Sequence, residues 1–136
     1  MILHKDHLAE IIEHAQHSKP DECCGLVGGT NTREAQTLYP LRNVSKHPQL
    51  AYEAAPEELF AAQRQMRERG EVLVGIYHSH PRAADPTPSE TDVRQAYYPA
   101  ATYLIVGLAG VEPLVKAFEI VEQEHRWHEV EYVITD

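Results

Sequence analysis

The segment from Val72 to His80 constrains the fold more than any other part of the chain. It reads Val-Leu-Val-Gly-Ile-Tyr-His-Ser-His, an apolar run that ends in two histidines one residue apart. Continuous apolar runs rich in β-branched residues are typical of strands buried within a sheet. Side chains alternate between the faces of a strand, so we expect His78 and His80 to point the same way, with Cα atoms about 6.6 Å apart. Two imidazoles at that spacing can bind one ion at Zn–N distances of about 2.0–2.1 Å.

The residues that follow supply a third ligand. Pro81, Pro86 and Pro88 interrupt regular structure. Ser89 then has the position of a helix N-cap, and Asp92 is the third helical residue. Ser-x-x-Asp taken alone is a capping box, and most such boxes only stabilise a helix. Beside two histidines, however, the Asp92 carboxylate completes a set of three ligands, and three protein ligands leave a fourth position for water, as in catalytic zinc sites.

His-x-His-Pro, a loop, and then Pro-Ser-x-x-Asp resembles the motif of the JAMM, or MPN-plus, metalloproteases. That family also carries a glutamate near its N-terminus, just before a strand of small residues. The segment 20–29, Pro-Asp-Glu-Cys-Cys-Gly-Leu-Val-Gly-Gly, is similar to it. The resemblance covers nearly the whole chain and is strongest to the short bacterial members. It implies an α/β fold in which helices sandwich a mixed β-sheet, a cytidine-deaminase-like architecture, with residues 1–136 as one domain.

The resemblance also implies a chemistry. His78, His80 and Asp92 would bind Zn²⁺, and Glu22 would take a proton from the bound water and pass it to the leaving amine. Ser89 would stabilise the oxyanion of the tetrahedral intermediate. The implied activity is hydrolysis of a peptide or isopeptide bond after the Gly-Gly tail of a ubiquitin-like protein, here a β-grasp sulfur carrier. By itself Glu22 reads as an exposed loop acid, and only the resemblance places it near the histidines.

Charge and hydropathy exclude several classes of partner. The chain has 21 acidic and 12 basic residues, a net charge of −9, and no basic cluster, which argues against nucleic acid and anionic membranes. No apolar run approaches the roughly 18 residues needed to span a bilayer. The N-terminus has no signal-peptide pattern. Cys23 and Cys24 are adjacent and unsuited to a mutual disulfide, so we expect a reduced, cytoplasmic protein. The sequence leaves the oligomeric state open.

Hydrophobic periodicity predicts the other elements. Helices are expected over residues 6–18 and 56–69, and a third begins after Ser89. Strands are expected over residues 24–29, 34–41, 72–80, 102–108, 114–121 and 126–134, with a short one over 49–54. This order fits a mixed sheet with helices packed on its faces.

Three alternatives stay open at this point. A catalytically inactive MPN scaffold would bind partners without metal and would usually lack motif residues, all of which are present here. A zinc deaminase requires His-x-Glu and Pro-Cys-x-x-Cys, neither of which occurs. A metal sensor without enzymatic activity would fill the fourth coordination position with a protein side chain.

Overall fold

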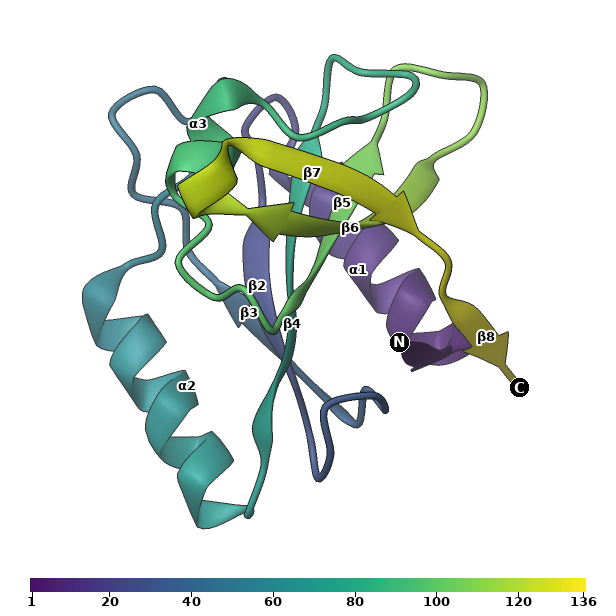
Figure 1. Ribbon diagram of the computed structural model, residues 1–136. Coiled ribbons are helices and arrows are strands. Elements are labelled where there is room, and N and C mark those ends of the chain that lie inside the picture. The colour runs from purple at the N-terminus through teal and green to yellow at the C-terminus, as the bar shows by residue number, and fades with distance from the viewer.

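A six-stranded mixed sheet forms the centre of the computed structural model, which describes residues 1–136 (Figure 1). In spatial order its strands are β3 (Thr37–Leu41), β2 (Cys24–Gly29), β4 (Val72–His80), β5 (Thr102–Gly107), β6 (Leu114–Val121) and β7 (Arg126–Val130). Strands β4 and β5 run parallel, and every other neighbouring pair is antiparallel. The predicted mixed α/β sheet is therefore confirmed.

Helices cover both faces of this sheet. The helices are α1 (Lys5–Ser18), α2 (Pro56–Glu68) and α3 (Glu90–Arg94), and a 3-10 turn, η1, covers Glu122–Glu124. Helix α1 packs on one face through the buried side chains of Ile11 and Ala15. Helices α2 and α3 cover the opposite face through Ala62, Met66 and Val93 (Figure 1). Because the central strands are buried on both sides, they read as continuous apolar runs in the sequence.

The two ends of the chain form a second, smaller sheet that the sequence did not predict. Strand β1 (Ile2–His4) pairs in parallel with β8 (Val133–Thr135), which places the termini side by side (Figure 1). The single strand expected over 126–134 is therefore wrong, because β7 pairs with β6 and β8 turns away to pair with β1. Between them, Tyr132 Oη donates a hydrogen bond to Val115 O at 2.7 Å.

Two further strand predictions are corrected. The strand expected over 34–41 begins only at Thr37. The segment 49–54 is not a strand: Leu50 and Ala51 donate backbone hydrogen bonds to His47 O, which makes a turn, and only Ala54 forms a bridge, to Asn43. Alternating apolar residues in a short segment are weak evidence when a polar side chain can satisfy the backbone instead.

Helix α1 is the longest helix with 14 residues. None of the helices has the length and hydropathy required to pass through a membrane.

Candidate metal centre and active site

Strand β4 and helix α3 bring the three predicted ligands together. The Nε2 atoms of His78 and His80 lie 3.1 Å apart, so both side chains point the same way, as the strand periodicity predicted. Asp92 Oδ2 lies 3.1 Å from His78 Nε2 and 3.0 Å from His80 Nε2. Atoms that bind one tetrahedral zinc ion at about 2.0–2.1 Å are about 3.3 Å from one another. The triangle of two imidazole nitrogens and one carboxylate oxygen therefore fits zinc in size and in chemistry.

A capping box holds the third corner of the triangle. Ser89 is the N-cap of α3, where its Oγ accepts a hydrogen bond from the Asp92 N–H at 3.0 Å. In return, Asp92 Oδ2 accepts from the Ser89 N–H at 2.9 Å. The same oxygen faces both imidazoles. The capping role and the ligand geometry thus coexist in one carboxylate, and the cap fixes the direction in which that carboxylate points.

Glu22 lies beside this triangle and not on the surface. Its side chain is 5% exposed, so the reading of Glu22 as an exposed acid is wrong. A carboxylate oxygen of Glu22 lies within 4.8 Å of ring nitrogens of both histidines. Glu22 could replace Asp92 as a ligand, but Asp92 at 3.0–3.1 Å fits the triangle better. Glu22 Oε1 is buried without a hydrogen-bond partner in the protein, so it needs a polar group from outside the chain.

The two carboxyl groups differ in their electrostatics. Burial raises the pKa of Glu22 to about 7, a shift that Asp92 reinforces and His78 opposes. Burial also disfavours the charge on Asp92, but His78, His80 and the Ser89 N–H outweigh it and hold the Asp92 pKa well below its usual range. Near neutral pH the metal-free site therefore combines an ionised carboxylate, Asp92, with one that can gain and lose a proton, Glu22, a pairing typical of acid–base catalysis.

Ser79, between the two histidines, ties Glu22 to the strand that carries them. Its buried Oγ accepts a hydrogen bond from the Cys23 N–H at 2.8 Å, and its own N–H donates to Cys23 O at 3.2 Å. On the other side, the Glu22 N–H donates to Pro48 O at 2.7 Å. No sequence pattern indicated a role for Ser79, because strand alternation shows only that it faces away from the histidines.

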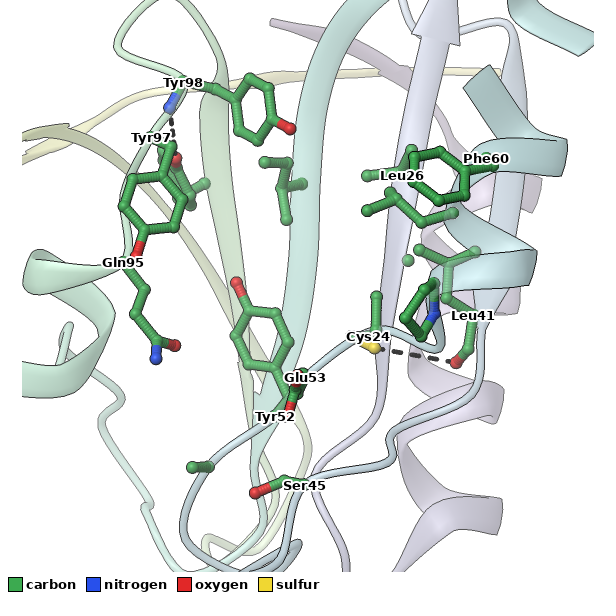
Figure 2. A pocket seen from close by; sticks show the side chains of 17 residues that line it. Cys24, Leu26, Leu41, Ser45, Tyr52, Glu53, Phe60, Gln95, Tyr97 and Tyr98 are labelled. Atoms are coloured by element: carbon green, nitrogen blue, oxygen red, sulfur yellow. Dashed lines mark hydrogen bonds between the residues drawn. The ribbon is translucent and has the colours of Figure 1, made fainter. Parts of the chain in front are cut away.

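An apolar cleft of about 470 Å³ has Tyr52 in its wall, while no residue of the triangle lines it (Figure 2). It lies between α2 and the segment after α3, with β2 and β4 as its floor. Figure 2 shows Tyr52 pointing between Tyr97 on one side and Cys24 and Leu26 on the other. The Tyr52 ring also packs against the His78 ring, with centroids 4.6 Å apart and an interplanar angle of 30°. No spacing in the sequence indicated that Tyr52 links the cleft to the site.

Residues 4–131 match the family described as prokaryotic homologs of the JAB domain. The chain belongs to this family. The predicted JAMM/MPN membership is thereby confirmed, and the match includes Glu22, both histidines, Ser89 and Asp92 within its bounds.

Two curated relatives of this JAB-domain chain are enzymes by name. It is 39% identical over 99 residues to the desampylase of Haloferax volcanii, covering 72% of this chain and 70% of that protein. It is 33% identical over 107 residues to the CysO-cysteine peptidase of Mycobacterium tuberculosis, covering 78% of this chain and 72% of that protein. Both names are those of enzymes, and the second agrees with the predicted peptidase activity.

Solved structures confirm the fold of the JAB-domain chain. A protein from Desulfitobacterium hafniense is 34% identical with a TM-score of 0.84, and the match covers 100% of this chain and 94% of that one. A JAB1/MPN domain protein from Archaeoglobus fulgidus shares the fold at 23% identity, with a TM-score of 0.65 and complete coverage of both chains.

Proposed function

We propose that this JAB-domain chain is a zinc-dependent peptidase that hydrolyses the amide bond after the C-terminal Gly-Gly tail of a ubiquitin-like, β-grasp sulfur-carrier protein. The observation that carries the proposal is the convergence of His78, His80 and Asp92 within 3.1 Å of one another beside the buried carboxylate of Glu22. The names of the two relatives, a desampylase and a CysO-cysteine peptidase, support the same class of substrate.

In this proposal Glu22 is the general base and then the general acid. Zinc, when bound, supplies Lewis-acid chemistry that makes water a nucleophile near neutral pH. Glu22 accepts the proton of that water on its carboxylate and afterwards donates it to the leaving amine. In the metal-free protein burial raises the pKa of Glu22 to about 7, and a cation bound beside it would favour the ionised carboxylate that accepts the proton. Burial of Glu22 keeps bulk water from competing for the proton.

Ser89 is the proposed donor to the developing oxyanion. Its Oγ accepts a hydrogen bond from the Asp92 N–H, and a hydroxyl that accepts one bond still has its own proton to donate. The capping box holds this hydroxyl on the same turn as Asp92. A donor fixed before the reaction stabilises oxyanion charge without reorganising during it.

The cleft lined by Tyr52, whose ring packs against His78, is the proposed entry for the tail of the substrate. Its walls are mostly apolar, and aromatic side chains, among them Tyr52 and Tyr97, project into it (Figure 2). An extended peptide can bury its apolar side chains in such a cleft. The two glycines at the end of the tail have no side chains, so they can approach a crowded site closely.

The test is hydrolysis of a sulfur-carrier protein with a C-terminal extension, followed by mass spectrometry. We expect Glu22→Gln to keep its zinc and to lose at least about 100-fold in kcat, because a positioned base contributes about 10²–10⁴-fold. Glu10→Gln, on the exposed face of α1, is the control. Near-normal turnover by Glu22→Gln would refute its role as the base. If the unchanged protein takes up no zinc after reconstitution, the inactive MPN scaffold becomes the better reading.

A further inference from the structure

The side-chain amide of Asn43 donates hydrogen bonds around Glu22. Its Nδ2 lies 3.0 Å from Glu22 O, 3.1 Å from Ala51 O and 3.4 Å from Pro48 O. Pro48 O also accepts the Glu22 N–H at 2.7 Å. Both backbone polar groups of Glu22 are therefore bound within one cluster around Asn43. A carboxamide has two N–H donors, so three acceptors use its full donor capacity.

The oxygen of the same amide fixes the segment that carries Tyr52. Asn43 Oδ1 accepts the N–H of Ser45 and the N–H of Glu53, each at 3.0 Å. The residues on either side of Tyr52 are thus both bound to Asn43, Ala51 through its carbonyl and Glu53 through its N–H. Backbone bonds close this loop at its two ends and form the turn at His47. The side chain of Asn43 is what joins the residues that flank Tyr52 to the main chain of Glu22.

We propose that Asn43 is a positioning residue for the peptidase reaction, which holds the main chain of Glu22 and the ring of Tyr52 in place around His78. This role rests on the proposed function of Glu22. Asn43 touches neither the ligand triangle nor the cleft, and acts through two residues that do. A catalytic carboxylate has to be held within a fraction of an ångström, and displacement by about 1 Å can reduce the rate about 100-fold.

The substitution Asn43→Asp tests the donor side of the amide apart from its acceptor side. An aspartate keeps the size and the accepting oxygen but places a second oxygen against the three carbonyls of Glu22, Ala51 and Pro48. We expect kcat to fall about 100-fold because the base moves, and KM to rise because Tyr52, which lines the cleft, moves with it. The zinc content should stay unchanged, because none of the three proposed ligands is bound to Asn43.

The chain offers a matched control at Asn31, in the turn after β2. Its Oδ1 accepts the N–H groups of Arg33 and Glu34 at 2.9 and 3.0 Å, and the structure shows no bond from its nitrogen. Asn31→Asp keeps both of these bonds, so we expect its kcat, KM and melting temperature to match those of the unchanged enzyme. Asn43→Ala is measured in parallel, because it removes the donors without adding a charge and keeps the test decisive if Asn43→Asp does not fold.

Two measurements separate positioning from general destabilisation. In a Glu22→Gln background, we expect Asn43→Asp to cause no further loss of kcat, because its effect passes through Glu22. In metal-free protein, NMR should show the ring protons of His78 losing the upfield shift caused by the Tyr52 ring in Asn43→Asp and keeping it in Asn31→Asp. The proposal is overturned if kcat stays within about threefold, if the losses multiply in the double variant, or if the His78 shift is unchanged. Full activity of Glu22→Gln would instead refute the proposed role of Glu22. The NMR measurement would then still show whether Asn43 holds the Tyr52 ring against His78.

Discussion

Replacing Glu22 with glutamine should stabilise the metal-free protein at neutral and alkaline pH. Glu22 is 5% exposed, and its Oε1 has no hydrogen-bond partner in the protein. Ionising it inside the fold therefore costs more than ionising it in the unfolded chain, where water solvates the charge. Glutamine has nearly the same shape and never carries the charge, so the variant avoids this cost.

The magnitude follows from the pKa of Glu22. Burial, the largest cause, raises it from 4.5 to about 7, a difference of about 2.5. At about 1.36 kcal/mol per pKa unit, this corresponds to about 3 kcal/mol. Below pH 4.5 the folded and unfolded chains both hold the proton. Between pH 4.5 and 7 the unfolded chain releases it first, so the unchanged protein loses stability as the pH rises, and above pH 7 the loss is complete.

The assay is urea unfolding of chelator-treated protein, followed by circular dichroism at intervals from pH 4 to 9. We expect the free energy of unfolding of Glu22→Gln to exceed that of the unchanged protein by about 3 kcal/mol at pH 8 and by little at pH 4. Glu10→Gln is the control for exchanging an exposed glutamate. A difference between Glu22→Gln and the unchanged protein that stays the same from pH 4 to 8 would refute the reasoning.

Two further substitutions test the ligand triangle and its cap. His78→Ala should lose both zinc, measured by atomic spectroscopy, and hydrolysis, because it removes a fully buried corner of the triangle; retained stoichiometric zinc would contradict the ligand assignment. Ser89→Ala should keep its zinc and lose about 1 kcal/mol of stability, because the N-cap hydrogen bond is lost. Its kcat should fall about 100-fold, because the proposed oxyanion donor is gone. An unchanged kcat would show that Ser89 takes no part in the reaction.

The parts of the fold that the sequence predicted are those with strong local signals. Residues 74–79 of β4 are buried, and the apolar run of this strand ends in histidines at the spacing that strand alternation requires. The Ser89 cap is visible because a capping box has a fixed spacing. The pairing of β1 with β8 had no such signal, since both strands have only three residues and their contact depends on the whole chain between them.

In the candidate site, too, the residues close in sequence were predictable and those brought together from distant segments were not. His78, His80 and Asp92 lie within 15 residues of one another, so local geometry brings them together. Glu22 was placed near them by family resemblance alone, because the register of β2 against β4 cannot be read from either strand. Asn43 and Tyr52 were missed, since a loop held by side-chain hydrogen bonds has no periodicity to read.

Asp92 Oδ2 belongs both to the cap of α3 and to the ligand triangle. With Asp92 as the proposed metal ligand, binding of a cation and ordering of this five-residue helix would be linked equilibria, each making the other more favourable. The turn after the proline-rich loop would then become ordered in the same step in which the newly made chain binds metal.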